Sequence, residues 1–281
     1  MIPDWQTNKV FLSKKLLTDY PKVAKRLEDK LASFDYVPEY LPNTNDIWAR
    51  DYMPLQFSDE QFIEYVFDPD YLKGKKYIRQ GIKTDPDAVC RAIGLETRKT
   101  GIILDGGNTV KSENSIIMTD KVFWENSKQY SDEELTQMLQ NIFNPCQVIF
   151  IPWDDGCIYG HADGMLRFID NKKVMISGFY EQVDDELKQL IVHALERANI
   201  AYECLRISEI EEEENIAYIN FLHTEHFILV PSLNKPEKDQ KALREISHFF
   251  KDYQIPVEQI ELSEVAKKSG ALNCITWTVK K

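Results

Sequence analysis

Apolar residues recur every three or four positions in five segments of this 281-residue chain, a spacing typical of amphipathic helices. Local signals support several of the boundaries. Ser131 and Glu134 form a capping box, Pro236 suits a first helical turn, and Gly94 suits a helix end. The predicted helices are 13–34, 85–93, 131–143, 184–199 and 236–253.

Short apolar runs rich in branched residues separate these helices and predict strands. The predicted strands are 61–67, 115–119, 147–151, 173–178, 227–231 and 275–279. The alternation favours an α/β fold. The length fits one large domain or two ordinary ones, but no low-complexity linker or composition break interrupts the chain. We therefore expect a single domain over residues 1–281.

Composition and charge exclude several classes of protein. A hydrophobic fraction of 43% is enough for a large core, so the chain is not a disordered acidic tail. Its 34 Lys and Arg stand against 46 Asp and Glu, and the net charge of −12 argues against nucleic acid or anionic membrane as a partner. The acidic run 209–214 is expected to be a solvated loop, and a role as a lid is left open.

The N-terminal segment gives no sign of export. Residues 1–15 contain neither the apolar run nor the small-residue cleavage site of a secretory signal. No stretch approaches the roughly 18 apolar residues of a membrane helix. We therefore expect a cytoplasmic protein, and a homodimer is compatible with the sequence.

The cysteines fit neither a disulfide framework nor a zinc ribbon, because they are five in number, scattered, and contain no C-x-x-C pair. Four of them are expected to be structural: Cys90, Cys146, Cys157 and Cys204. Cys157 is close to His161 in sequence, so an accessory role is left open for it. No metal site is expected, because the short pair His161 and Asp163 would need further ligands.

Polar residues with catalytic potential occur in five short phrases at near-equal intervals. The anchors of these phrases are Asp51, Asp105, His161, Asn220 and Cys274, and successive anchors are 54, 56, 59 and 54 residues apart. A fixed period of about 56 residues, with one predicted helix in each unit, is typical of a closed or stacked array. If each unit directs its strands to a common axis, the five anchors meet in one central cleft.

The chemistry of these residues favours attack on a planar cation. Cys274 is the candidate nucleophile, and His161 is the candidate general acid and base because it titrates near neutrality. The carboxylates Asp51, Asp105 and Asp163 would repel a developing oxyanion. They suit a guanidinium group, whose N–H donors pair with carboxylates in a two-pronged fashion.

The same phrases carry a family resemblance. Residues Trp48 to Asp51, Asp105 to Asn108, Gly160 to Asp163 and Gly270 to Thr276 resemble the agmatine deiminase and bacterial-type peptidylarginine deiminase family of the guanidine-modifying (pentein) superfamily. The matches span nearly the whole chain in the family's order. The resemblance implies a five-bladed α/β propeller built from about five ββαβ-type pseudo-repeats, which agrees with the period.

The resemblance also implies a reaction. Cys274 would attack the guanidinium carbon, and His161 would protonate the departing ammonia to leave a covalent thiouronium intermediate. His161 would then activate water, and a ureido product would leave. No metal or organic cofactor would be needed.

The resemblance implies roles for the other residues as well. Asp51 and Asp163 would hold the guanidinium nitrogens, and Asp105 would orient His161. Trp48 would flank the substrate, and Asn220 would line the pocket. The expected partner is therefore a small cationic guanidine, such as agmatine or an arginine derivative.

Three departures from the family pattern leave the substrate's tail open. Asp105 stands where relatives often have Glu, Met53 stands where they usually have Gly, and 269–273 is poorer in glycine. Two alternatives to a deiminase also remain. An amidinotransferase would use the same intermediate with an amine acceptor, and a non-catalytic guanidine-binding protein would need no nucleophile.

Overall fold

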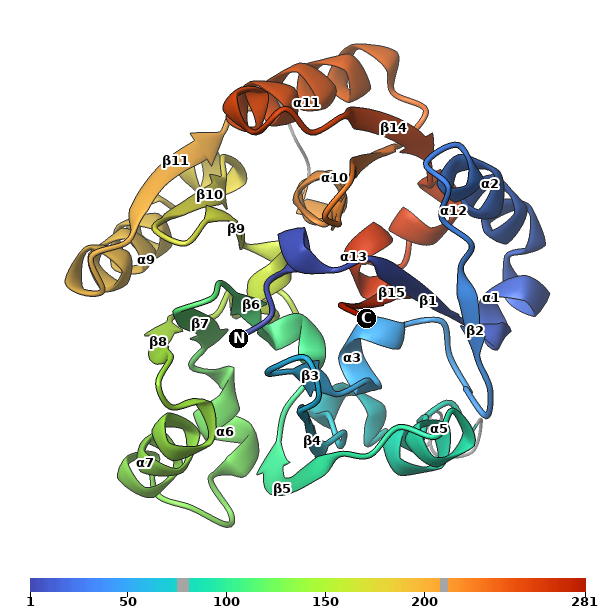
Figure 1. The fold of residues 1–281 in the computed structure, drawn as a ribbon. Coiled ribbons are helices and arrows are strands. Elements are labelled where there is room, and N and C mark those ends of the chain that lie inside the picture. Colours follow the sequence, from blue (N-terminus) through green and yellow to red (C-terminus); the bar gives the residue numbers. More distant parts are fainter. Residues whose placement is uncertain (75–80, 208–211) are drawn as a thin grey trace.

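The strands of the computed structural model, which describes residues 1–74, 81–207 and 212–281, form five three-stranded sheets arranged in a ring (Figure 1). In each sheet the middle strand pairs antiparallel with one neighbour and parallel with the other. The sheets are β15 (Thr276–Val279), β1 (Lys9–Ser13) and β2 (Glu39–Leu41); β3 (Leu55–Gln56), β4 (Phe62–Val66) and β5 (Arg98–Ile103); β6 (Val110–Lys111), β7 (Ser115–Thr119) and β8 (Gln147–Ile151); β9 (Leu166–Asp170), β10 (Lys173–Ser177) and β11 (Ala201–Leu205); and β12 (Leu222–His223), β13 (Ile228–Ser232) and β14 (Val257–Glu261). The predicted five-bladed α/β architecture is confirmed.

Helices connect the middle strand of each sheet to its parallel neighbour, because a parallel pair needs a crossover connection. They lie on the outside of the ring (Figure 1). They are α1 (Lys14–Asp19) and α2 (Pro21–Ala32); α5 (Pro86–Ala92); α6 (Lys121–Asn126) and α7 (Asp132–Phe143); α8 (Phe179–Val183) and α9 (Asp185–Arg197); and α11 (Pro236–Phe249). The five predicted helices are present. The first is two helices rather than one, because Pro21 begins a new helix after the non-helical Tyr20.

A short helix precedes the inner strand of each sheet, and these helices carry the five anchors. They are α3 (Ala49–Tyr52), η3 (Gly106–Asn108), η4 (Ala162–Gly164), α10 (Glu212–Ile219) and α13 (Leu272–Ile275). Each anchor lies within its helix or directly beside it. Cys274 is on α13, and β15 begins two residues later, one residue after the predicted start of the last strand at 275.

Pairing of the first and last strands of the chain, which lie in the same sheet, closes the ring. β15 pairs antiparallel with β1 in the register Lys9 to Val279 through Leu12 to Thr276. The N-terminal η1 (Asp4–Gln6) runs across the middle of the ring, and both chain ends lie near the centre (Figure 1). The remaining short helices are η2 (Asp70–Leu72), η5 (Lys251–Tyr253) and α12 (Ser263–Ala266).

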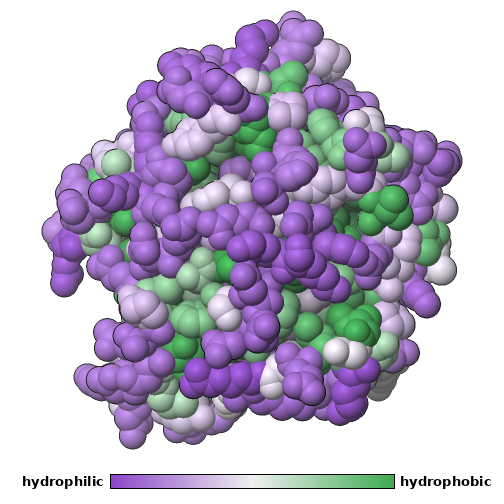
Figure 2. All heavy atoms as spheres, viewed as in Figure 1, coloured by the Kyte–Doolittle hydropathy of each residue, from purple (hydrophilic) through white to green (hydrophobic). Residues whose placement is uncertain are grey.

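The apolar core is divided into five clusters between the sheets and their helices. The surface seen in Figure 2 is largely hydrophilic, with apolar residues in separate small areas. Within the described ranges, no helix has both the length and the apolar character needed to cross a membrane. Residues 209–211 of the acidic run lie outside the described residues, and 212–214 form the start of α10 (Glu212–Ile219) where a loop was expected.

Trp277 on β15 tests how far stability depends on ring closure. Its side chain is 3% exposed, contacts Phe11 of β1, and donates a hydrogen bond from Nε1 to the Pro54 carbonyl at 2.9 Å. Trp277→Ala should lower the free energy of unfolding in urea by about 3–5 kcal/mol. Trp124→Ala, which truncates a 56%-exposed tryptophan, should change it by about 0.5 kcal/mol or less. Equal effects of the two variants would contradict this account of closure.

Candidate active site

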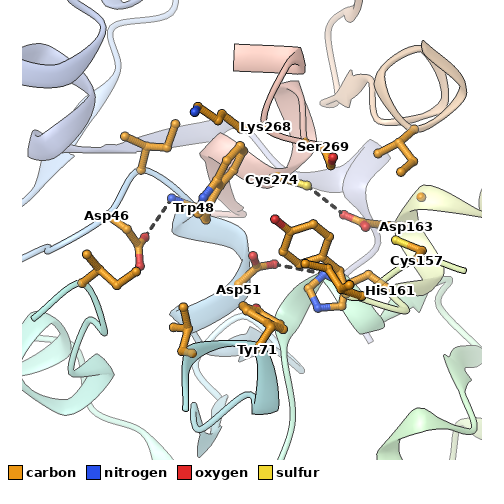
Figure 3. Close-up of a pocket in the computed structure, with 18 of the residues that line it drawn as sticks. Asp46, Trp48, Asp51, Tyr71, Cys157, His161, Asp163, Lys268, Ser269 and Cys274 are labelled. Atoms are coloured by element: carbon orange, nitrogen blue, oxygen red, sulfur yellow. Dashed lines mark hydrogen bonds and ion pairs between the residues drawn. The ribbon is translucent and has the colours of Figure 1, made fainter. Parts of the chain in front are cut away.

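A cavity of about 880 Å³ opens where the short helices meet, and five of the seven predicted site residues line it. They are Trp48, Asp51, His161, Asp163 and Cys274. Their side chains point toward one another from α3, η4 and α13 (Figure 3). The structure therefore brings together residues that are more than 200 positions apart in the chain.

Asn220 does not line the cavity, so the expectation that it would is wrong. Its side chain is fully buried and bridges two residues that do line it. Oδ1 accepts hydrogen bonds from the backbone N–H of Cys274 at 3.0 Å and of Ala271 at 3.2 Å. Nδ2 donates to Oδ2 of Asp163 at 3.0 Å. Asn220 therefore positions Cys274 and Asp163 relative to each other.

The thiol of Cys274 lies against Asp163. Sγ is 3.7 Å from Oδ2 of Asp163 and donates a hydrogen bond to it. The same Oδ2 accepts from Nδ2 of Asn273 at 2.6 Å, a contact that sequence reasoning missed. Burial, together with the negative charges of Asp163 and Asp51, raises the pKa of Cys274 well above its usual range. At neutral pH Cys274 is therefore a neutral thiol.

His161 lies between two carboxylates. Its Nε2 is 2.8 Å from Oδ2 of Asp105, and its Nδ1 is 3.7 Å from Oδ1 of Asp51. Burial alone would lower the pKa of His161, but Asp51 and Asp105 outweigh it and raise the pKa to about 9. His161 is therefore an imidazolium at neutral pH, with Nε2 held by Asp105.

Asp105 lies behind the cavity wall, 2% exposed, and its short side chain reaches His161. Its Oδ2 also accepts a hydrogen bond from the hydroxyl of Tyr71 at 2.9 Å. Tyr71, on η2, lines the cavity and was not among the predicted residues. It lies in no recognisable motif, and only the folded chain places it beside Asp105.

The second glycine of the phrase Asp105 to Asn108 is required by close packing. The backbone N–H of Gly107 donates to Oδ1 of Asp51 at 3.2 Å. A Cβ at this position would lie 2.5 Å from Nδ1 of His161 and 2.7 Å from Oδ1 of Asp51. Gly107 therefore allows η3 to approach both side chains.

Trp48 forms another part of the wall, packed against Gly270. A Cβ on Gly270 would lie 2.5 Å from the Trp48 ring, so a glycine there sets the ring's position. The backbone N–H of Trp48 donates to Oδ1 of Asp46 at 2.9 Å. Asp46 also lines the cavity, and burial raises its pKa to about 7. Asp46 was not predicted, although it stands two residues before Trp48.

The other cysteines differ in their surroundings. Cys90, Cys146 and Cys204 are buried, whereas Cys157 is half-buried and lines the cavity (Figure 3). Across residues 1–74, 81–207 and 212–281, no group of three or more His, Cys, Asp or Glu side chains could hold a metal ion.

Comparisons with known proteins agree with this geometry. The family model for Porphyromonas-type peptidyl-arginine deiminase matches residues 11–279. A search of curated proteins found no significant match. Among solved structures, the agmatine deiminase of C. jejuni is 17% identical, with a TM-score of 0.78 over 100% of this chain and 95% of that one. The agmatine deiminase of Enterococcus faecalis is 18% identical, with a TM-score of 0.75 over 100% and 95%.

A more distant structural relative is DDAH from Pseudomonas aeruginosa. It is 13% identical, with a TM-score of 0.58 over 98% of this chain and 100% of that one. At these identities the likeness shows a shared fold. The fold expected from the sequence resemblance is therefore confirmed.

A matched pair of glycine substitutions tests the packing around His161. Gly107→Ala should cost about 1–3 kcal/mol of stability through overpacking. It should also lower the pKa of His161 from about 9, because the new methyl group separates the ring from Asp51. Gly164→Ala, on the equivalent helix η4, places its Cβ 3.7 Å from Ile216, an ordinary contact, and should change neither property. NMR titration of the His161 ring and urea unfolding measure both. An unchanged pKa in Gly107→Ala would contradict the close-packing account.

Proposed function

Because this chain belongs to the Porphyromonas-type peptidyl-arginine deiminase family, we propose that it hydrolyses the guanidine group of a small arginine-like substrate. The products are a ureido compound and ammonia. One observation carries the proposal: two buried carboxylates, Asp51 and Asp163, line the same cavity as a cysteine and a protonated histidine. The resemblance seen in the four polar phrases is confirmed by the family match.

The two carboxylates form the binding site for the guanidinium group. Asp51 and Asp163 are 7% and 2% exposed, so water screens a charge between them poorly. Burial raises the pKa of Asp51 well above its usual range, and a bound cation favours the charged form of Asp51 and is itself held strongly. A guanidinium directs N–H donors outward in a plane, and carboxylates on both sides accept them. The ring of Trp48 adds an aromatic wall on which a planar cation stacks favourably.

Binding of the cation activates the nucleophile. In the empty site Asp163 and Asp51 raise the pKa of Cys274, so the thiol keeps its proton. A guanidinium placed between the two carboxylates offsets both charges and lowers that pKa. The thiol proton passes to bulk water as the thiolate forms beside the carbon that it attacks, and the free enzyme holds no exposed thiolate.

The proton that departs with ammonia comes from His161. Its Nε2 is engaged with Asp105, so Nδ1 is the nitrogen that exchanges protons with the substrate. Cys274 forms a bond to the guanidinium carbon, and the C–N bond breaks as Nδ1 protonates the leaving nitrogen. Neutral His161 then takes a proton from water, whose oxygen adds to the thiouronium carbon. The C–S bond breaks, and the ureido product leaves.

The proposed substrate is agmatine or a related small guanidine. Solved structures that share the fold include the agmatine deiminase of C. jejuni with substrate bound. Amidino transfer is the second candidate, because it uses the same thiouronium with an amine in place of water. The two reactions give different products. Which of them occurs depends on whether water or an amine fits the cavity as the acceptor.

Product analysis tests the reaction. Purified protein should release ammonia and a ureido product from one member of a panel of agmatine, free arginine and a blocked arginine peptide. Cys274→Ala should abolish both products, since it removes the thiol that attacks the guanidinium carbon. Cys204→Ala, which removes a buried thiol that does not line the cavity, should leave them unchanged.

Two results would argue against hydrolysis. Product that forms only after an amine is added would favour amidino transfer. An unreactive Cys274 in alkylation, together with no product from any guanidine, would contradict the catalytic interpretation and favour a binding protein.

The pH dependence tests the role of His161. The imidazolium is the acid, so kcat should fall as the pH rises through about 9. Asp105→Asn removes a negative charge that raises this pKa, so the descending limb should move to lower pH. Asp87→Asn, at a surface carboxylate of α5, should leave the limb in place. A limb that does not move in Asp105→Asn would exclude His161 as the titrating acid.

A further inference from the structure

A second group of buried charges surrounds the N-terminal η1, which crosses the ring's centre (Figure 1). Oδ1 of Asp4 is 2.8 Å from Nζ of Lys111 and 3.9 Å from Nη1 of Arg50. Oδ2 of Asp4 is 2.7 Å from Nη2 of Arg167. We call Asp4, Arg50, Lys111 and Arg167 the axial charge cluster. Its cations come from α3, β6 and β9, so one carboxylate joins three blades.

The cluster contains more positive than negative charge and is shielded from water. Arg50, Lys111 and Arg167 are 3–7% exposed, and Asp4 is their shared carboxylate. Burial would raise the pKa of Asp4, but Lys111 and Arg50 outweigh it and hold the pKa well below its usual range. Buried cations that lose their counter-ion are strongly unfavourable. The arrangement of the three cations therefore depends on Asp4.

Arg50 connects the cluster to the nucleophile. It precedes Asp51 in the chain, and its Nε donates to the carbonyl of Asn273 at 3.3 Å. Asn273 precedes Cys274 and donates from its side chain to Asp163. Movement of the Arg50 guanidinium is therefore transmitted to the backbone of α13.

Arg167 connects the cluster to the residue that holds the nucleophile. Its Nη1 donates to the carbonyl of Phe221 at 2.9 Å, and its guanidinium lies 4.7 Å from the centre of the Phe221 ring. Phe221 follows Asn220, whose side chain binds the backbone of Cys274 and Oδ2 of Asp163. Both routes from Asp4 therefore end at Cys274 and Asp163.

We propose that Asp4 is a positioning residue for the guanidine reaction. Asp4 holds Arg50 and Arg167, and these two side chains keep Cys274 and Asp163 in their reactive arrangement. The proposal rests on the proposed function. Asp4 contacts neither the cavity nor the substrate. Its effect is on the geometry of the nucleophile, so its loss should lower kcat much more than it changes KM.

The main test compares Asp4→Asn with Glu113→Gln. Asp4→Asn keeps the shape but leaves three cations without a carboxylate, and kcat should fall about 10- to 100-fold with KM within about threefold of wild type. Glu113 also fastens the N-terminal segment, through Gln6, but contacts no cation of the cluster. Glu113→Gln should therefore retain kcat. Equal kcat values for Asp4→Asn and wild type, or equal losses in the two variants, would overturn the proposal.

Chemical rescue separates the charge from a general structural effect. Asp4→Gly leaves space beside the three cations for a small carboxylate. Added sodium formate should therefore restore kcat in Asp4→Gly, and neutral formamide at the same concentration should not. Rescue by both compounds, or by neither, would overturn the role assigned to the carboxylate.

A measurement that does not depend on turnover distinguishes a failure of this proposal from a failure of the proposed function. The rate of Cys274 alkylation by iodoacetamide, measured against pH, should change in Asp4→Asn and remain as in wild type in Glu113→Gln. If wild type forms no product from any guanidine, the proposed function fails, and the alkylation profiles still decide the role of Asp4. If Asp4→Asn does not fold, Asp4→Ser, which also removes the carboxylate, replaces it: lowered kcat at an unchanged melting temperature supports the proposal, and wild-type kcat overturns it.

Discussion

Pairing between the first and last strands is the constraint on which the site depends. Cys274 lies two residues before β15, and β15 finds its antiparallel partner in β1 at the other end of the chain. That pair helps to hold Cys274 beside Asp163, 111 residues away in sequence. Each blade contributes one short helix to the centre, so the closed ring and the cavity share the same contacts. Stability and site geometry therefore depend on the same strand pairing.

Charge balance is the second constraint. The cavity wall holds Asp51 and Asp163, with Asp105 behind it, and in the unliganded structure His161 is the cation between them. Such a site favours a positive ligand, because burial penalises carboxylates that are not fully paired. The same carboxylates keep Cys274 and His161 protonated. The proposed binding of a cation, the protonated thiol and the availability of an acid thus follow from one arrangement of charges.

The sequence predicted the blades and the cavity residues because both leave local signals. Helical periodicity located the outer helices, and the regular spacing of the polar phrases predicted one central cleft, although the short inner helices were not predicted. Nine of the fifteen strands in the described residues were also missed. β3, β6 and β12 have two residues each, which are too few to show a period, and the others are β1, β2, β5, β9, β11 and β14. Tyr71 and Asp4 were missed for a different reason. Their roles arise from contacts across the ring, which no local pattern records.

The position of Asn220 shows that a residue's type and its spacing in the repeat do not decide whether its side chain faces the cavity or lies behind the wall. All five anchors lie within the short helices or directly beside them, yet Asp51, His161 and Cys274 face the cavity whereas Asp105 and Asn220 lie behind it. The two residues behind the wall each bind a residue in front of it: Asp105 holds His161, and Asn220 holds Cys274. The anchors of the repeat therefore have two kinds of role, because some face the cavity and others support the groups that do.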